Sequence, residues 1–434
     1  MDQREFARRR RQFMRMIGRE SIAILPAAPV RHRNADIEYP YRQDSHFHYL
    51  TGFGEPEAVA ALLPGRAQGE FVMFVREHDP LRESWDGAWA GTDGAVARHG
   101  ADDAFPIEDI DDILPGLLEN RERIFYSMGR HPDFDPRVLG WVNALRAQGR
   151  DGATGPQEFV ALNHVLDDMR LFKSRAEQVR LRRAARITVD AHRRVMRFAQ
   201  PGRMEYEVMA ELTHEFRAHN ADFSYPPIVA AGANACVMHY RRNDQRLEDG
   251  ALLLVDAGCE CEYYASDVTR TVPIGGRFSP AQRAVYEVVL EAQLAAIEKV
   301  RAGNHWNDPH EAAVRVITQG LVRLGLLAGP LARLLRQEAY APFFGHRTGH
   351  WLGLDVHDVG DYRVGGEWRV FEPGMALTVE PGIYIRPGPR VPREFWNIGV
   401  RIEDDVLVTA GAPEVLTAAL EKTPDAVERL MGAA

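Results

Sequence analysis

The chain of 434 residues has few cysteines and lacks any long apolar run. Its three cysteines, Cys236, Cys259 and Cys261, lack the paired spacing of a zinc site or a disulfide framework, so we expect free thiols that are buried or half-buried. No stretch of about 18 apolar residues is present, which argues against a membrane-spanning helix. Prolines interrupt the first apolar stretch, SIAILPAAP, which therefore does not resemble a secretory signal. Together these absences predict a cytoplasmic protein.

An excess of basic charge is also missing. Lys and Arg total 53 against 62 Asp and Glu, and the net charge of -9 is spread along the chain, which argues against a nucleic-acid surface. One basic run, the four arginines at residues 8–11, precedes apolar residues. Because acidic neighbours dilute it, we expect the solvated face of a first helix rather than a membrane-binding segment. The length favours two domains over one.

Short apolar runs alternate with amphipathic stretches in the first third of the chain. SIAILPAA, AVAALLP, GEFVMFVR and RIFYSMG are typical of strands, and IEDIDDILPGLLEN and DPRVLGWVNALRAQ are typical of helices. This alternation predicts an α/β domain at residues 1–170. The polar, glycine-rich segment QGRDGATGPQ follows, and Ser174 with Glu177 then forms a capping box that predicts a long helix. We expect the domain boundary between residues 149 and 173.

The rest of the chain, residues 171–434, has the pattern of an α+β domain. Ser279 with Gln282 and Asp308 with Glu311 each predict a helix that begins with an N-cap and a proline in its first turn. The stretches ALLLVDAG, SDVTRTVPI, GMALTVEPGIYI and VRIEDDVLVT are short, rich in branched residues and typical of strands. Helices grouped apart from hairpin-like strands predict a sheet that is covered on one side.

These strand-like stretches carry acidic residues where strands usually carry apolar ones. The acids are Asp256, Asp267, Glu380 and Glu403. Burying a carboxylate on the covered side of a sheet costs free energy unless the carboxylate is paired or bound to a metal ion. A single acid of this kind could as well cap a turn or face solvent. Four of them in branched apolar sequence favour a functional site.

The segment GHRTGHWLGLDVHD contains three histidines, His346, His350 and His357. Its glycines argue against a helix and indicate a place where backbone and ligand approach closely. A lone histidine is more often a core residue, but three beside four acids suggest metal ligands. A set rich in oxygen suits manganese or cobalt better than a structural zinc. Four carboxylates, about -4 in charge, would nearly balance two divalent cations and a hydroxide, although spacing alone does not give the number of ions.

The order of these motifs, DAG, SDVTRT, GHWLGLDVHD, EPG and RIEDD, resembles the pita-bread metallopeptidases. These motifs most resemble those of the aminopeptidase P family of the proteobacterial type. The resemblance continues through YRQDSHFHYLTGFGEPEA and MRLFKS over nearly the whole chain. The resemblance implies an α/β N-terminal domain at 1–170 and a pita-bread catalytic domain at 171–434. It also implies hydrolysis of the first peptide bond of peptides with proline at the second position, by a hydroxide that bridges two divalent ions, expected to be Mn²⁺.

The resemblance also implies a metal-ligand set. Its members are Asp256, Asp267, His350, Glu380 and Glu403. Asp267 and Glu403 would be shared between the two ions. Glu380 would in addition act as acid and base for the bridging water.

Further residues match positions that bind substrate or support the ligands in this family. His239 and His357 would bind the substrate and stabilise the tetrahedral intermediate, and His346 would line the proline pocket. Tyr384 and Arg401 would be partners of the ligands, with a place in catalysis.

Trp85, in RESWDG, matches a tryptophan that family tetramers lend to the substrate site of a neighbouring subunit. The resemblance therefore implies a homo-oligomer, a tetramer or a dimer, although a tryptophan that is merely exposed or packed is an equal alternative. Asp36, in NADIEYP, resembles an acid near the same mouth.

The main alternative is a prolidase, which shares the five ligands but hydrolyses only Xaa-Pro dipeptides. The YRQ and ESWDG segments favour the aminopeptidase by resemblance alone. A methionine aminopeptidase usually lacks so long an N-terminal domain. A pita-bread binding module without activity, or a creatinase-like hydrolase, would have lost ligand residues that are all present here.

Overall fold

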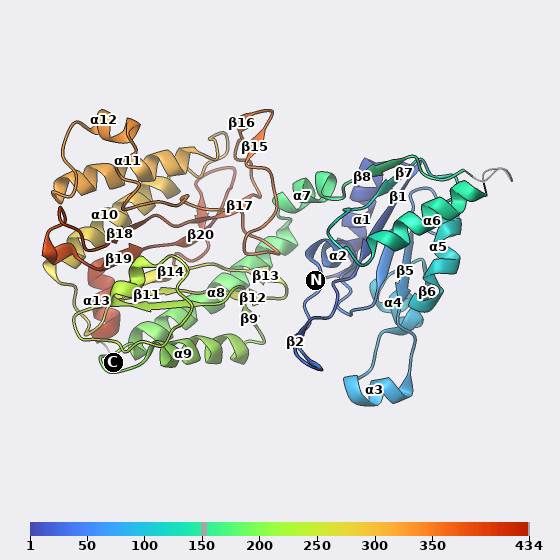
Figure 1. Cartoon of the computed structure of the whole chain (residues 1–434), viewed down its shortest axis with the longest axis horizontal. Coiled ribbons are helices and arrows are strands. Elements are labelled where there is room, and N and C mark those ends of the chain that lie inside the picture. Colours follow the sequence, from blue (N-terminus) through green and yellow to red (C-terminus); the bar gives the residue numbers. More distant parts are fainter. Residues whose placement is uncertain (149–153, 433–434) are drawn as a thin grey trace. The chain divides into compact units, whose positions relative to one another are not determined.

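The computed structural model describes residues 1–148 and 154–432, which form two compact units, Met1–Met169 and Arg170–Ala434. The glycine-rich segment that precedes the expected domain boundary lies partly at residues 149–153, outside the described residues. Each unit has its own hydrophobic core. The two are therefore described separately (Figure 1).

The N-terminal unit is built on a six-stranded sheet with the order β6-β5-β4-β1-β7-β8. Its strands are β1 Ser21–Pro26, β4 Val59–Leu62, β5 Phe71–Val75, β6 Asp103–Pro106, β7 Arg123–Phe125 and β8 Glu158–Val160. Strand β1 pairs parallel with β7 and antiparallel with β4, so the sheet is mixed. Each of the four predicted apolar runs contains one of these strands. A separate hairpin consists of β2 His32–Asn34 and β3 Ile37–Glu38.

Helices accompany this sheet and complete an α/β unit. They are α1 Gln3–Ile17, α2 Ser45–Thr51, α3 Pro80–Asp86, α4 Gly91–His99, α5 Ile110–Leu118, α6 Asp135–Ala147 and α7 Asn163–Leu171, with a 3₁₀ turn η1 at Ile107–Asp109. Apolar residues of α5 and α6, among them Leu114 and Trp141, share one core with Ile24 and Phe74 of the sheet. The two predicted helical stretches are therefore confirmed.

The arginine run at residues 8–11 lies in α1, but only part of it faces solvent. The side chains of Arg9 and Arg10 are buried, so the prediction of a solvated face was wrong for these two. The guanidinium of Arg9 lies 4.1 Å from the ring centre of Tyr49, and that of Arg10 lies 4.0 Å from the ring centre of Phe71. Burial lowers the pKa of Arg10 to about 10. Four consecutive residues span more than one helical turn, so they cannot all share one face.

The C-terminal unit contains the long helix predicted from the capping box at Ser174. Its helices are α8 Arg175–Phe198, α9 Glu205–Ala218, α10 Pro280–Ile297, α11 Asp308–Arg323, α12 Leu331–Arg336 and α13 Pro424–Gly432, with 3₁₀ turns η3 at Gly232–Cys236 and η4 at Arg393–Phe395. The capping boxes at Ser174 and Ser279 are both present. The predicted cap at Asp308 was wrong, because Asn307 is the N-cap and the Asp308 carboxylate accepts a hydrogen bond from the backbone of His305.

The strands of this unit form small antiparallel sheets, as the hairpin-like pattern predicted. The first two sheets are β10-β11-β14, at Ile228–Ala231, Leu252–Asp256 and Thr269–Pro273, and β17-β20-β21, at Ala376–Val379, Asp404–Leu407 and Glu414–Val415. The others are β18 Gly382–Ile385 with β19 Ile398–Arg401, β13-β12-β9 at Tyr264–Ala265, Cys259–Cys261 and Asp222–Phe223, and β15 Arg363–Val364 with β16 Glu367–Trp368.

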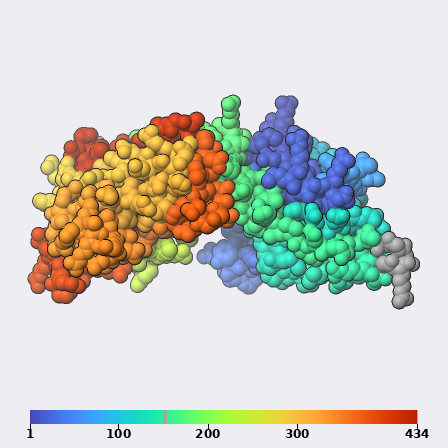
Figure 2. Space-filling model, turned by 90° about the horizontal axis from the view of Figure 1, so that it is seen from above, coloured from blue at the N-terminus to red at the C-terminus, as the bar shows by residue number. Residues whose placement is uncertain are grey.

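A large core joins helices and strands of the C-terminal unit. Leu253 of β11, Val400 of β19, Val289 of α10 and Ile317 of α11 all belong to it. In the space-filling view of Figure 2, the yellow and orange atoms of the segment from α10 to α12 form a broad outer face of this unit. The order of an α/β part and then an α+β part agrees with the prediction.

The structure bears on two expectations from the sequence, those for the cysteines and for a membrane-spanning helix. The three cysteines are free and buried, as predicted. Among the described residues, no helix combines the length and the apolar character that a bilayer crossing requires.

A buried group of opposite charges connects the beginning of the C-terminal unit to the histidine-bearing loop. Arg170 contacts Asp355 at 2.7 Å and Asp358 at 2.5 Å, and Nζ of Lys173 lies 3.0 Å from Asp358. The side chains of Arg170, Lys173 and Asp358 are each only 1% exposed. Because Asp358 directly follows His357, this group fixes the backbone of the loop from its buried side.

We predict that Asp358→Asn lowers the free energy of unfolding by about 3–5 kcal/mol, because two buried cations then lose their shared anion. Denaturant unfolding measures the change. The matched control is Glu414→Gln, which breaks a pair with Arg182 in which both side chains are 38% exposed. That control should cost no more than about 1 kcal/mol. Equal losses in the two variants would contradict the assigned role of Asp358.

Candidate active site

Four acidic residues reach one place in the C-terminal unit because strand ends converge there. Asp256 ends β11, Asp267 precedes β14, Glu380 follows β17 and Glu403 precedes β20. Asp256 is paired with Thr269 in the ladder between β11 and β14. The backbone N–H of Glu403 donates to the carbonyl of Thr269 at 3.1 Å and so joins the two sheets. The local pairing of strands therefore accounts for the cluster.

The loop that carries His350 lies against β17. The backbone N–H of Thr378 donates to the carbonyl of His350 at 3.0 Å. At the neighbouring Gly349, a side-chain carbon would lie 2.0 Å from the carbonyl oxygen of Thr378, so only glycine fits this close approach. The Nδ1 atom of His350 lies 2.9 Å from the carbonyl of Trp351, which leaves Nε2 directed toward the acids. The close approach at Gly349 is thus one of backbone to backbone, and the approach of backbone and ligand expected from the sequence stays a prediction.

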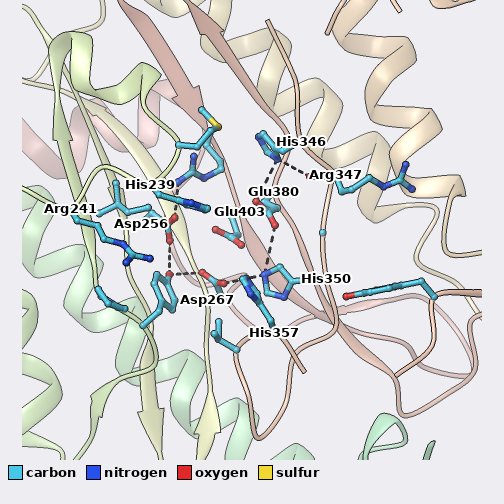
Figure 3. Close-up of a pocket in the computed structure, with 18 of the residues that line it drawn as sticks. His239, Arg241, Asp256, Asp267, His346, Arg347, His350, His357, Glu380 and Glu403 are labelled. Carbon is cyan, nitrogen blue, oxygen red and sulfur yellow. Dashed lines mark hydrogen bonds and ion pairs between the residues drawn. The ribbon is translucent and has the colours of Figure 1, made fainter. Parts of the chain in front are cut away.

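The five residues expected as metal ligands face one another in Figure 3. Donor atoms of Asp267, His350 and Glu403 lie within 4.8 Å of one another. The Nε2 atom of His350 is 3.3 Å from Asp267 and 3.8 Å from Glu380. Asp256 lies beside this group and is linked to it through the hydroxyl of Tyr225. Four carboxylates and one imidazole are a suitable donor set for divalent ions that favour oxygen.

The acids are buried close to one another, and this raises their affinity for protons or cations. Burial and the neighbouring carboxylates raise the pKa of Glu403 well above its usual value, and burial raises the pKa of Asp256. Burial raises the pKa of Glu380 to about 7. Burial acts in the same direction on Asp267, but the hydrogen bond and charge of His350 lower its pKa overall. The donor set thus has a surplus of negative charge that divalent ions would balance.

The phenol of Tyr225 is a member of the site that the sequence did not reveal. Its oxygen lies 2.5 Å from Asp256 and within hydrogen-bonding distance of Asp267. A phenol has one proton to donate, so it can donate to only one of these carboxylates at a time. The residue lies in the motif SYPP, which contains no acid or histidine and gave no signal of a site.

Arg401 and Tyr384 connect the acids to His346. Arg401 contacts Asp256 at 2.6 Å and donates to the hydroxyl of Tyr384 at 2.9 Å. The Tyr384 hydroxyl lies 2.9 Å from Nε2 of His346, whose Nδ1 lies 2.7 Å from the carbonyl of Arg347. Burial lowers the pKa of His346 to about 4. The imidazole is therefore neutral at neutral pH and accepts a hydrogen bond from the Tyr384 hydroxyl at Nε2.

His239 and His357 line the same cavity without joining the ligand group. Both are exposed at its wall, and the ring centre of His357 lies 4.3 Å from that of His350. Neither belongs to the group of donor atoms that could share an ion among the described residues. Their positions suit contact with a bound molecule.

The cavity above the acids has a volume of about 730 Å³. This is within the range of pockets that enclose a small molecule or a short peptide. Its wall combines the acids and histidines with apolar and aromatic side chains, among them Pro226, Ile228, Met238, Trp306 and Trp368. Three arginines, Arg241, Arg347 and Arg401, also line it.

The two N-terminal candidates lie in surface segments of their own unit. Trp85 lies in α3 with 80% of its surface exposed. Asp36 lies in the turn between β2 and β3 and is exposed. Neither is among the residues that line the cavity of the C-terminal unit.

The sequence and fold of this chain match a known class of hydrolase. The pattern of metallopeptidase family M24 matches residues 179–410, and that of the aminopeptidase P N-terminal domain matches residues 6–126. The chain therefore belongs to metallopeptidase family M24, with an α/β N-terminal domain and an α+β pita-bread catalytic domain as predicted.

Individual members of this family are similar to the chain over nearly its full length. The Xaa-Pro aminopeptidase of Escherichia coli (strain K12) is 42% identical over 436 residues, covering 100% of this chain and 99% of its own. Xaa-Pro aminopeptidase 3 of Homo sapiens is 33% identical and covers 99% of this chain and 86% of its own. The solved structure of the Pseudomonas aeruginosa aminopeptidase PepP has a TM-score of 0.99 at 58% identity, covering 100% of this chain and 98% of that one.

We predict that Asp267→Asn removes bound metal, because a neutral amide takes the place of a charge that is central to the donor group. After loading with Mn²⁺ and desalting, elemental analysis should show the metal content reduced by half or more. His357→Ala is the matched control, since it should retain metal while turnover falls by about 10²-fold. Full metal content in the Asp267 variant, or metal loss in the folded His357 variant, would contradict the assignment.

Proposed function

We propose that this chain is a Xaa-Pro aminopeptidase, which removes the first residue of peptides that have proline at the second position. The observation that carries the proposal is the meeting of Asp256, Asp267, His350, Glu380 and Glu403 in one cavity, in a family M24 chain. Relatives similar over the full length support it. The aminopeptidase P of E. coli, 42% identical with a TM-score of 0.97, has been solved with zinc substituted and product bound, and with the inhibitor Pro-Leu.

We further propose that these five residues hold two divalent ions, with Mn²⁺ as the resident metal and Asp267 and Glu403 shared between them. The charge of four buried carboxylates supports two ions rather than one. When bound, such ions would lower the pKa of water and polarise the carbonyl of the scissile bond. The buried free thiols agree with the proposed cytoplasmic location, where disulfides are rare.

The domain assignment is also part of the proposal. Residues 1–170 would be the aminopeptidase P type N-terminal domain and residues 171–434 the pita-bread catalytic domain. The compact units Met1–Met169 and Arg170–Ala434 support this division. The two family matches, at 6–126 and 179–410, agree with it.

The acid and base of the reaction would be the carboxylate of Glu380. It takes a proton from the attacking water and delivers it to the nitrogen of proline as the peptide bond breaks. That nitrogen is tertiary in the peptide, so no N–H needs an acceptor in the site. The position of Glu380 at the end of β17, beside His350 and Asp267, supports this role.

The neighbouring histidines would bind the substrate and stabilise its developing charge. His239 and His357, exposed at the cavity wall, would donate to the oxygen of the tetrahedral intermediate. His346 would contact the proline ring, with its ring held by Tyr384 and Arg401 as described above. An imidazole that is fixed in the cavity lining is suited to contact an apolar ring.

The alternative is a prolidase restricted to dipeptides. The cavity, at about 730 Å³, has room for residues beyond the proline and therefore favours the aminopeptidase. A prolidase would in addition require the free carboxylate of proline. The two functions differ in a measurable way, because only the aminopeptidase accepts a chain that continues after proline.

We predict that the Mn²⁺-loaded protein cleaves Ala-Pro-Ala between its first two residues and leaves Ala-Ala-Ala essentially intact, because the site recognises the proline ring. The products are identified by mass spectrometry, with the dipeptide Ala-Pro assayed in parallel. Cleavage confined to Ala-Pro would replace the proposal by prolidase. Equal cleavage of Ala-Ala-Ala would exclude both functions.

We also propose that the chain forms a homo-oligomer, a tetramer or a dimer, in which Trp85 contributes to the substrate site of a neighbouring subunit. The exposure of 80% of a tryptophan on a short helix supports this role, since large aromatic residues are enriched where partners bind. The resemblance to family tetramers supports it further.

We predict that Trp85→Ala raises the KM for peptides of five residues more than for tripeptides and leaves metal content unchanged. Sedimentation of the unmodified protein should show an oligomer at assay concentration. The exposed Leu81 on the same helix provides the control variant, Leu81→Ala, for a general effect of the helix. A monomer of full activity would leave Trp85 without this role.

A further inference from the structure

The mouth of the cavity carries arginines for which no ion pair is found among the residues the structure describes. Arg241 lines the cavity two positions after His239, is exposed, and forms no ion pair within this described part of the chain. Arg347 lines the cavity on the other side of the acid cluster, as Figure 3 shows. The acids themselves lie deeper, where other groups contact them.

Arg347 is held in place without an acidic partner. Its Nη2 donates to the side-chain carbonyl of Asn307 at 2.5 Å, and its guanidinium lies 5.2 Å from the ring centre of Trp368. Glu311 is hydrogen-bonded to the amide of the same Asn307, at 2.6 Å. The charge of Arg347 is therefore positioned by neutral groups and by a ring.

A second guanidinium lies against the same ring. Arg363 is exposed and does not itself line the cavity, but it lies 4.0 Å from the ring centre of Trp368, which does. Burial lowers the pKa of Arg347 and the charge of Arg363 adds to this effect, whereas Tyr340 and Glu311 act in the opposite direction. Two like charges on one aromatic side chain repel each other, and a bound anion would relieve this repulsion.

The acids on the cavity floor are not the partners of these arginines. Asp256 is paired with Arg401 at 2.6 Å, and Asp267 with His350 at 3.3 Å. Glu403 accepts a hydrogen bond of 2.6 Å from the hydroxyl of Thr269. The acids at the base of the cavity thus have partners within the site. The arginines at its mouth form no ion pair with them.

We propose that Arg241, Arg347 and Arg363 select peptides with a carboxylate just after the proline, either an acidic third residue or the free carboxyl end of a tripeptide. The inference rests on the proposed function, because it requires the first residue at the acids and the proline next to them. The third residue then lies toward the mouth. Exposed charges in water contribute modestly, so we expect about a 10-fold preference in kcat/KM for Glu over Lys at this position.

The experiment compares amidated tripeptides, Ala-Pro-Glu, Ala-Pro-Gln and Ala-Pro-Lys, with the non-amidated Ala-Pro-Gln. The amidated series isolates the third side chain, and the last peptide isolates the terminal carboxylate. The expected order of kcat/KM is Glu, Gln, Lys, and the non-amidated Ala-Pro-Gln should exceed its amide. Raising the ionic strength should reduce these ratios, because screening weakens exposed charges.

Arg241→Gln, Arg347→Gln and Arg363→Gln should each reduce the preference for Glu, mainly through KM, and the triple variant should nearly abolish it. Arg277→Gln removes an exposed charge of the same unit that does not line the cavity, and it should leave the ratio unchanged. Equal cleavage of all the peptides, or a preference that survives in the triple variant, would overturn the inference. Failure to cleave any of them would instead count against the proposed function.

Discussion

The mutual repulsion of four carboxylates, three of them buried and that of Glu380 half-buried, is the constraint on which the rest of the catalytic unit depends. Asp256, Asp267, Glu380 and Glu403 come from strand ends that the hydrogen-bonded sheets bring together. Removing such charges from water costs several kcal/mol each unless other groups compensate. Arg401 supplies part of the compensation as a cation, and the hydroxyls of Tyr225 and Thr269 supply part as donors. The remaining negative charge makes this cavity a place for divalent ions.

The acids and the histidine loop could be predicted because each breaks a local rule. A carboxylate at the end of a branched apolar run, as in LLLVD, is unfavourable for a strand and therefore informative. The glycine at 349 was informative for the same reason, since its close contact with the carbonyl of Thr378 allows no side chain. The helix starts at Ser174 and Ser279 rested on short-range hydrogen bonds, which local sequence determines.

Other features could not be predicted, because they depend on partners that are distant in sequence. Tyr225 joins the site only through acids that lie 31 and 42 positions away. Arg9 and Arg10 had the composition of a solvated face, and their burial depends on Tyr49 and Phe71, which belong to other elements. The positive charge at the cavity mouth is a further case, because Arg347 and Arg363 are brought together by the ring of Trp368. Local periodicity carries no information about such pairs.

The separation along the chain between Asp256 and Arg401 has a consequence for the order in which the unit folds. The two residues are 145 positions apart, and Arg170 and Asp358 are 188 positions apart. During synthesis at about 5–20 residues per second, the acids therefore wait many seconds for their compensating cation. Strands β11 and β14 can pair early, but burying Asp256 is unfavourable until β19 has emerged. The catalytic unit must accordingly close as one late, cooperative step, with high contact order and slow folding.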